Sequence, residues 1–402
     1  MTHKTSHRAR HTFVFSFLLS SLGTLALQGN PALAADLPAF SAEDVFEMEY
    51  ANDPQVSPDG ARVAYVRSAM DIMTDRTRRS IWVVDVDGDN HRPLVSGSGT
   101  FSSPRWSPSG DRLAYLSNTE GKTQLFVKWL DGGETAKVTT LPESPRSIVW
   151  SPDGKHIAFT RFVPSPPPKL ADMPAKPKGA KWAEPATVVD RMTFRFDGGG
   201  YLPTGNQQVF VVPADGGTPR QMTSGDYPIS GSVSWMPDSQ SIIFSSNRRE
   251  DVEYHPRQND LYAASLVTGE LTQMTDHAGP ESDPAVSPNG RYLAYTSAAD
   301  TRQGYNRSDL RIMDLTSGES RSLTADLDRS VSDIQWSANS KSVWIRYNDL
   351  GMARIAEVDL KGNLKQADIV LGGTALGRPY TSGAFSVGGK DRIAYTLGRD
   401  DR

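Results

Sequence analysis

The chain contains seven copies of one short unit, in which a strand-like segment leads into a Ser-Pro-Asp-Gly-like turn and a second apolar segment follows. The turns begin at Ser57, Ser107, Ser151, Met236, Ser287, Ser337 and Ser386. Their spacings are 50, 44, 85, 51, 50 and 49 residues, so the third spacing holds one period plus an insertion. A repeat of about 40 to 50 residues with several short strands per unit is typical of a β-propeller. We therefore expect each unit to form one blade.

The turn residues suit a connection between antiparallel strands. Pro presets φ for a type I turn, Asp tolerates the next position, and Gly accepts a positive φ where the chain re-enters the sheet. The strands that follow, such as residues 63–66 and 157–159, are apolar on both faces, which predicts sheets covered on both sides. One register position before the turn is expected to pack between blades; it holds Trp106, Trp150, Trp235 and Trp336, or Val56, Val286 and Phe385.

Two further strand patterns lie between successive turns, which gives four antiparallel strands per unit. In the seventh unit the second strand covers residues 393–396, and the sequence given ends six residues later, at Arg402. The sequence thus predicts an all-β fold over residues 53–402. This fold is a seven-bladed β-propeller of four-stranded antiparallel blades, with the last blade incomplete.

The first 34 residues have the pattern of a secretory signal peptide. Lys4, Arg8 and Arg10 precede an apolar stretch at 13–27, and Ala-Leu-Ala ends at Ala34. We expect cleavage near Ala34 and a periplasmic or secreted protein. Residues 35–52 are expected to form an N-terminal segment with a short helix that begins at Ser41, since Ser is a good N-cap and acidic residues follow it.

Composition excludes several classes of function. The chain has no Cys, which rules out catalysis by Cys and a lipid anchor on Cys. No segment after the leader is long and apolar enough to predict a membrane span. A formal net charge of −4 with no basic block argues against a nucleic-acid partner.

Four motifs accompany the leader and the repeat. They are Ser-Ala-Glu-Asp-Val-Phe at 41–46, the first repeat at 53–60, Arg-Phe-Asp-Gly-Gly-Gly-Tyr at 195–201 and Ser-Asn-Arg at 246–248. Together they resemble the prolyl oligopeptidase family of serine peptidases, in particular its acylaminoacyl-peptidase and dipeptidyl-peptidase-like bacterial branch. The resemblance implies a propeller followed by an α/β-hydrolase domain, whose Ser, Asp and His cleave short peptides.

The nucleophile elbow of that family, G-x-S-x-G, does not occur in the chain. Ser98 lies between Gly97 and Gly99 but lacks the required glycine spacing, and residues 318–322 fail at their last position. No catalytic residue, metal ligand or cofactor is assigned, and the C-terminal hydrolase domain is expected to be missing, so this chain is predicted to be inactive alone. An incomplete last blade would expose a strand edge, which predicts aggregation or strand exchange.

The long period contains an insertion at about 162–206. Six prolines alternate with four lysines between residues 164 and 181, a composition that favours an extended loop over a β-ladder. The insertion is either a solvated surface loop or a flap over one face of the propeller, where it would touch a hydrolase domain or restrict substrate entry.

A cluster of mixed charge follows the fourth repeat and supplies the candidate substrate-binding residues: Arg248, Arg249, Glu250, Asp251 and Glu253. The resemblance implies that propeller carboxylates bind the free amino terminus of a substrate, and a carboxylate in a shielded cavity suits an ammonium group. The alternative is an ordinary solvated loop.

Three functions fit the sequence. The first is the substrate-gating propeller of an exported serine peptidase that cleaves short peptides, and the second is a non-enzymatic periplasmic binding propeller of the Tol-system type. The third is a metal site in the central pore, which would need inward Asp, Glu, Asn or His residues recurring at one register; we find no such set in the sequence. Peptide specificity and oligomeric state stay open.

Overall fold

The computed structural model describes residues 41–184, 186–373 and 383–398. Residues Val45–Arg402 form one compact unit, and Met1–Asp44 form another. The predicted signal peptide and its cleavage site near Ala34 lie outside the described residues. No helix among the described residues is long and apolar enough to cross a membrane.

Six antiparallel sheets of four strands make up most of the unit Val45–Arg402. The first blade consists of β1 (Glu49–Val56), β2 (Arg62–Asp71), β3 (Arg76–Asp85) and β4 (Arg92–Val95). The second consists of β5 (Phe101–Trp106), β6 (Arg112–Ser117), β7 (Gln124–Trp129) and β8 (Thr135–Lys137), and the third of β9 (Pro145–Trp150), β10 (His156–Pro164), β13 (Gly205–Pro213) and β14 (Arg220–Gln221).

The fourth blade consists of β15 (Ile229–Trp235), β16 (Ser241–Ser246), β17 (Asp260–Ser265) and β18 (Leu271–Gln273). The fifth consists of β19 (Glu281–Val286), β20 (Tyr292–Ala298), β21 (Ser308–Asp314) and β22 (Ser320–Ser322), and the sixth of β23 (Val331–Trp336), β24 (Ser342–Asp349), β25 (Met352–Asp359) and β26 (Leu364–Leu371).

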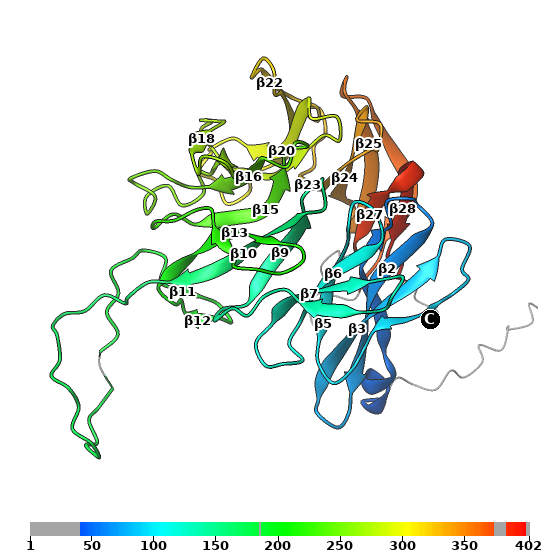
Figure 1. The fold of residues 1–402 in the computed structure, drawn as a ribbon. Helices are drawn as coiled ribbons and strands as arrows, with labels where there is room; N and C mark the ends of the chain where they lie inside the picture. The colour runs from blue at the N-terminus through cyan, green and yellow to red at the C-terminus, as the bar shows by residue number, and fades with distance from the viewer. Residues whose placement is uncertain (1–40, 185, 374–382, 399–402) are drawn as a thin grey trace, which may run out of the picture. The chain divides into compact units, whose positions relative to one another are not determined.

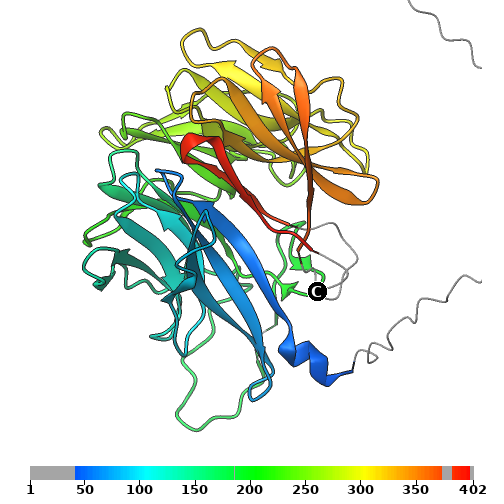
Figure 2. The ribbon, with the colours of Figure 1, turned by 90° about the vertical axis from the view of Figure 1, so that its right-hand side faces the viewer.

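The fold is an all-β propeller with six blades, and the predicted number of seven is wrong. The seventh repeat forms a two-stranded sheet of β27 (Phe385–Gly388) and β28 (Arg392–Tyr395), with the short 3₁₀ helix η2 (Gly389–Asp391) between them. These strands pair only with each other among the described residues. Figure 2 shows this sheet, in red, beside the first blade, in blue, and β1 contacts both strands.

The predicted N-terminal helix is a single 3₁₀ turn, η1 (Glu43–Glu47), and none of its residues is buried. It cannot extend further, because β1 already begins at Glu49. Tyr50 belongs to that strand.

The Ser-Pro-Asp-Gly turns are stabilised by their own side chains. In the first turn, Ser57 Oγ donates a hydrogen bond to Asp59 Oδ1 (2.5 Å) and accepts one from the Arg62 N–H (2.9 Å). Asp59 Oδ1 also accepts from the Ala61 N–H (3.0 Å), and Gly60 adopts a φ of +71°. The Ser57 hydroxyl and the Ala61 N–H hold the pKa of Asp59 below its usual value. This turn thereby fastens the first two strands of its blade at one end.

A side-chain hydrogen bond crosses each of the seven junctions between neighbouring sheets. Where the second sheet carries Trp before its turn, the indole N–H donates to a carbonyl of the preceding sheet: Trp106 to Gln55 (2.9 Å), Trp150 to Arg105 (3.0 Å), Trp235 to Val149 (3.2 Å) and Trp336 to Ala285 (2.8 Å). The other junctions use a backbone N–H: Val286 to Ser234 Oγ (3.0 Å), Val387 to Gln335 Oε1 (2.8 Å) and Val56 to Ser386 Oγ (3.0 Å). The sheets are thus held in register as well as packed.

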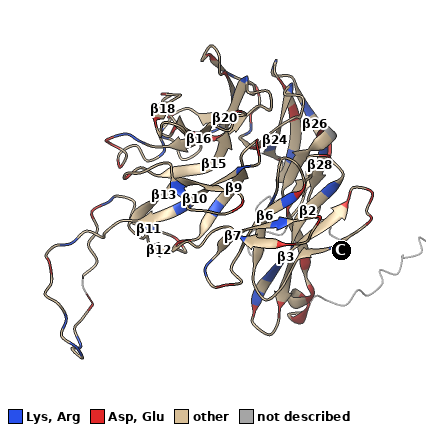
Figure 3. Cartoon of the chain, viewed as in Figure 1, with Lys and Arg blue, Asp and Glu red and all other residues tan. Residues whose placement is uncertain are grey.

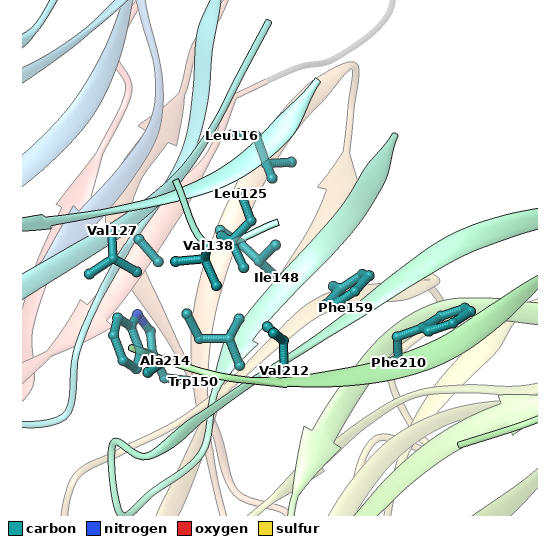
Figure 4. Close-up of a cluster of buried hydrophobic side chains, with 12 residues drawn as sticks. Leu116, Leu125, Val127, Val138, Ile148, Trp150, Phe159, Phe210, Val212 and Ala214 are labelled. Atoms are coloured by element: carbon teal, nitrogen blue, oxygen red, sulfur yellow. The ribbon is translucent and has the colours of Figure 1, made fainter. Parts of the chain in front are cut away.

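Apolar clusters fill the space between blades, as the two-sided apolar strands predict. Between the second and third blades, Leu125, Ile157 and Phe159 are fully buried, and Trp150 is 7% exposed. Figure 4 shows this cluster. A blade therefore contributes apolar side chains to both of its neighbours.

A β-bulge interrupts the pairing of the first and second strands in every blade. The left-handed residues on the first strands are Asp53, Ser103, Ser147, Gly231, Asp283 and Asp333. First strands of neighbouring blades contact one another, which places them at the centre of the propeller. Three Asp residues therefore do recur at one inner register, which corrects the expectation that no such set exists. Asp53 pairs with Arg105 and Asp333 with Arg346 (2.9 Å each).

Candidate functional site

The insertion and the charged cluster emerge from the same rim of the propeller. Both β10 and β16 run away from their turns, and the loops that follow them, 165–204 and 247–259, therefore leave at the same face. The first loop is the insertion of the third blade. The strands that flank it, β10 and β13, stay paired up to Pro164 and Gly205. Figure 1 shows the insertion extending from the third blade.

The insertion contains little regular structure. Its one hairpin joins β11 (Arg195–Phe196) and β12 (Gly200–Tyr201), and its described residues before Arg195 lie in no helix or strand. Many of its apolar side chains are exposed, including Leu170 (83%), Met173 (69%) and Tyr201 (65%). An exposed apolar concentration of this kind marks an interaction or ligand-binding surface.

Three hydrogen bonds fix the base of the insertion and the start of β13 to neighbouring segments. Asp226 accepts hydrogen bonds from Arg191 (2.7 Å) and from Asn206 Nδ2 (2.6 Å). The backbone N–H of Met192 donates to Glu253 Oε2 (2.5 Å). The Met192–Glu253 hydrogen bond holds one arm of the insertion against loop 247–259, and Asp226 fixes the insertion to the link that precedes β15.

A cavity of about 1430 Å³ is lined mainly by the insertion and, on one side, by residues of the link before β15 and of loop 247–259. Trp182, Phe194, Tyr201 and Leu202 contribute apolar surface, and Glu253 lines it from loop 247–259. Of the charges on its wall, Arg191 is paired with Asp226, and Lys169 lies 3.7 Å from Asp172. The cavity therefore combines an apolar lining with a few carboxylates and cations.

The five predicted substrate-binding residues occupy different environments. Glu253 borders the cavity, whereas Glu250 is exposed. Arg249 Nε lies 3.3 Å from Asp251 Oδ1, and Asp251 Oδ2 lies 3.4 Å from His255 Nε2. Two of the five, Arg249 and Asp251, are thus paired within their own loop.

Arg248 is partly buried. Its guanidinium lies over the ring of Tyr227, 4.4 Å from the centroid, and 5.8 Å from that of Tyr262. Burial lowers the pKa of Arg248. Its contacts with two aromatic rings give it a structural role at the base of the loop.

Charged residues of both signs are interspersed along the strands and loops of the molecule (Figure 3).

Sequence reasoning missed two buried carboxyl groups beside this loop. Asp260 and Glu281 are 4% and 1% exposed. An alignment of the repeats could have identified Asp260, because it occupies the position of Gln124 in the second blade and Gln208 in the third. No group of three or more His, Cys, Asp or Glu able to hold a metal ion occurs in the part of the chain that the structure describes.

Comparison with known proteins agrees with this architecture. Residues 59–163 match the TolB β-propeller domain, and residues 181–301 match the dipeptidyl peptidase IV N-terminal region. The chain is 29% identical over 225 residues to an uncharacterized peptidase, YuxL, of Bacillus subtilis, which covers 55% of this chain and 33% of the relative. It is 24% identical over 371 residues to dipeptidyl-peptidase 5 of Porphyromonas gingivalis, which covers 88% of this chain and 53% of the relative.

These matches support a propeller portion of the prolyl oligopeptidase type. The chain spans between one third and about half of the length of these curated relatives. Among solved structures, the acylaminoacyl peptidase of Pyrococcus horikoshii shares the propeller fold, with a TM-score of 0.60 and 17% identity over 81% of this chain and 47% of that one. The propeller described here carries its insertion and its cavity on one rim.

Proposed function

We propose that this propeller is the substrate-gating part of an exported serine peptidase that cleaves short peptides. In this proposal an α/β-hydrolase domain with a Ser-Asp-His triad performs the chemistry, and the propeller admits substrates. The observation that carries it is the match of residues 181–301 to the dipeptidyl peptidase IV N-terminal region, because those residues include most of the cavity lining and the whole charged cluster. Export follows from the leader pattern at residues 1–34.

The rim loops supply the means of selection. Ligand pockets of about 300–1,000 Å³ hold a drug-sized molecule, and the cavity of about 1430 Å³ is large enough for a short peptide. The insertion acts as a flap beside that space, attached at its base through Asp226 and Glu253. Folded proteins would be excluded by size.

Glu253 is the residue that we propose meets the amino group of a substrate. It is the member of the cluster whose carboxylate borders the cavity, and an apolar surrounding strengthens its attraction for an ammonium group. Arg248, Arg249, Glu250 and Asp251 would shape the loop that presents it.

The test is to express the complete natural reading frame that contains this chain, and in parallel the 402-residue chain. Both are assayed on chromogenic dipeptide and N-acylated peptide substrates, with and without a serine-directed inhibitor. We expect inhibitor-sensitive hydrolysis by the complete product and no turnover by the 402-residue chain. A complete product that contains no G-x-S-x-G elbow and hydrolyses neither substrate would refute the proposal.

The role of Glu253 is tested in the same complete enzyme. Glu253→Gln is expected to raise KM for substrates with a free amino terminus by about tenfold, since about 1.4 kcal/mol of charge attraction is lost, and to leave N-acylated substrates unchanged. Glu250→Gln is the matched control, because Glu250 lies exposed on the same loop. Equal effects of the two substitutions would remove Glu253 from this role.

A binding scaffold without chemistry is the second candidate. The match of residues 59–163 to the TolB β-propeller domain favours it. The two candidates differ in the first assay, because a scaffold binds its partner through the rim loops without hydrolysing either substrate.

A further inference from the structure

Two acidic side chains are buried together at the junction of the fourth and fifth blades. Asp260 is the first residue of β17, and Glu281 is the first residue of β19. The Glu281 N–H donates to the carbonyl of Asn259 (2.9 Å), and Ser245 Oγ donates to the carbonyl of Glu281 (2.6 Å). These bonds bring the starts of the two strands together at the rim, directly after loop 247–259.

The other blades show what this position ordinarily does. In the second blade, Gln124 accepts a hydrogen bond from Thr139 Oγ1 (2.9 Å) and donates Nε2–H to the Leu141 carbonyl (3.0 Å). In the third blade, Gln208 accepts from Thr223 Oγ1 (2.6 Å) and donates to the Gly225 carbonyl (3.0 Å). The amide thus both accepts and donates, and it ties the end of the fourth strand to the start of the third.

Asp260 keeps the frame of this arrangement but not its donor. The Leu261 N–H still donates to Thr275 Oγ1 (2.9 Å), as in the other blades, and Gln273 Nε2 donates to Asp260 Oδ2 (3.3 Å). Asp260 Oδ1 and Glu281 Oε2 are buried and have no hydrogen-bond partner among the described residues. A carboxylate can donate a hydrogen bond only when it carries a proton, so the missing donor can be restored by protonation.

The surrounding charges favour one retained proton. Burial and the charge of Glu281 raise the pKa of Asp260 to about 6, Asp276 adds to the rise, and Arg249 and His277 oppose it. Burial likewise raises the pKa of Glu281, against the hydroxyls of Thr275 and Ser297 and the charge of Arg311. Two adjacent buried carboxyl groups cannot both ionise without a large desolvation cost.

We propose that Asp260 and Glu281 share one proton and form a pH-responsive link at the root of loop 247–259. With the proton in place, the protonated carboxyl group can donate an O–H hydrogen bond, as the amides of Gln124 and Gln208 donate N–H, and the two blades stay joined at the rim. When the proton leaves to solvent as pH rises, the two carboxylates repel each other. Arg249, which contacts Asp251 on the loop, is then drawn toward Asp260, and the loop that borders the cavity is repositioned. This link lies beside the site of the proposed function. Only one of its consequences, that substrate entry depends on pH, rests on that proposed function.

The experiment measures the melting temperature of the 402-residue chain between pH 4 and pH 7.5. A carboxyl group whose pKa is raised by folding contributes stability that is present below its unfolded pKa and is lost as pH rises through its folded pKa. The wild type should therefore lose stability between about pH 4 and 6.5 relative to Asp260→Gln, which installs the residue found at 124 and 208. At pH 7 the unfolding equilibrium constant of Asp260→Gln should be at least about tenfold lower than that of the wild type.

Asp309→Asn is the matched control. Asp309 occupies the equivalent position in the fifth blade, where Arg307 lies 3.2 Å away, so its removal should not reproduce the pH-dependent gain. Glu281→Gln serves as a second variant if Asp260→Gln does not fold, and it should show the same gain. Hydrogen exchange of loop 247–259, corrected for its intrinsic pH dependence, should quicken above pH 6 in the wild type and not in Asp260→Gln.

Two results would overturn the proposal. The first is a parallel pH dependence of the wild type and Asp260→Gln. The second is a rise in melting temperature at pH 7 when calcium is added to the wild type but not to Asp260→Gln, because the carboxylates would then hold a metal ion in place of a proton. Neither measurement depends on peptidase activity, so failure of this inference can be told apart from failure of the proposed function.

Discussion

The indole hydrogen bonds between blades give the sharpest prediction for stability. In Trp150→Phe, the Arg105 carbonyl loses its buried donor at 3.0 Å, which costs about 1–3 kcal/mol. The smaller ring also leaves a void in a cluster where Trp150 is 7% exposed, which adds about 1–2 kcal/mol. The Arg112 guanidinium, 4.9 Å from the ring centroid, can still lie over a phenyl ring. We therefore expect the free energy of unfolding to fall by about 3 kcal/mol.

The measurement is equilibrium unfolding in guanidinium chloride, followed by circular dichroism of the β-sheet. Trp182→Phe is the control, since Trp182 is 41% exposed on the insertion and should change the free energy of unfolding by less than about 0.5 kcal/mol. A loss below about 1 kcal/mol in Trp150→Phe, or one equal to the control, would show that the indole bonds do not hold the blades together.

Two further predictions concern the turns. Gly60→Ala should lower the melting temperature by several degrees, because a Cβ at this positive φ would collide with the carbonyl of Gly389 across the junction of the first and last sheets. Gly88 also has a positive φ but has open space around it, so Gly88→Ala should lower the melting temperature much less. Ser57→Ala should lower the melting temperature near pH 7 and flatten its fall in acid: the hydroxyl lowers the pKa of Asp59, so the stability it provides is present above the unfolded pKa and is lost by the wild type as pH falls, which narrows the gap between the two. Melting temperatures from pH 3 to 7 test this, and an unchanged acid limb in Ser57→Ala would contradict it.

The sequence was sufficient for the class of fold because its signals are local. The turn residues act within four positions of each other, and Gly60, Gly110, Gly154 and Gly290 all adopt the positive φ that was expected. The two-sided apolar strands required covered sheets, and the inter-blade clusters confirm this. The role of Ser57 was missed, because its hydrogen bond to the Arg62 N–H joins two strands and becomes visible only when both are placed.

The number of blades and the junctions depended on contacts that are distant in sequence. Seven repeats suggested seven blades, yet the seventh repeat forms a two-stranded sheet among the described residues. The sequence identified Val56, Val286 and Phe385 as substitutes for Trp. It did not indicate that Ser234, Gln335 and Ser386 accept hydrogen bonds from backbone N–H groups at these junctions. These partners lie on a neighbouring blade, about 50 residues away or at the other end of the chain.

The candidate site was located in part. Sequence composition singled out the insertion and the charged cluster separately, and the structure places them on one rim around a cavity. Their proximity follows from strand direction, whereas the attachment of Met192 to Glu253 and of Arg191 to Asp226 could not be read from composition. The assignment of all five cluster residues to substrate binding stays a prediction, with Glu253 best placed for it.

Each sheet in this propeller is built from one contiguous stretch of the chain, and β1 pairs with β2 instead of completing the last sheet. A break in the polypeptide between two blades would therefore leave every hydrogen-bonded ladder whole. It follows that circularly permuted versions, with new termini in the links between blades, should retain the same architecture, and that two halves produced separately should reassemble as a pair of subunits does.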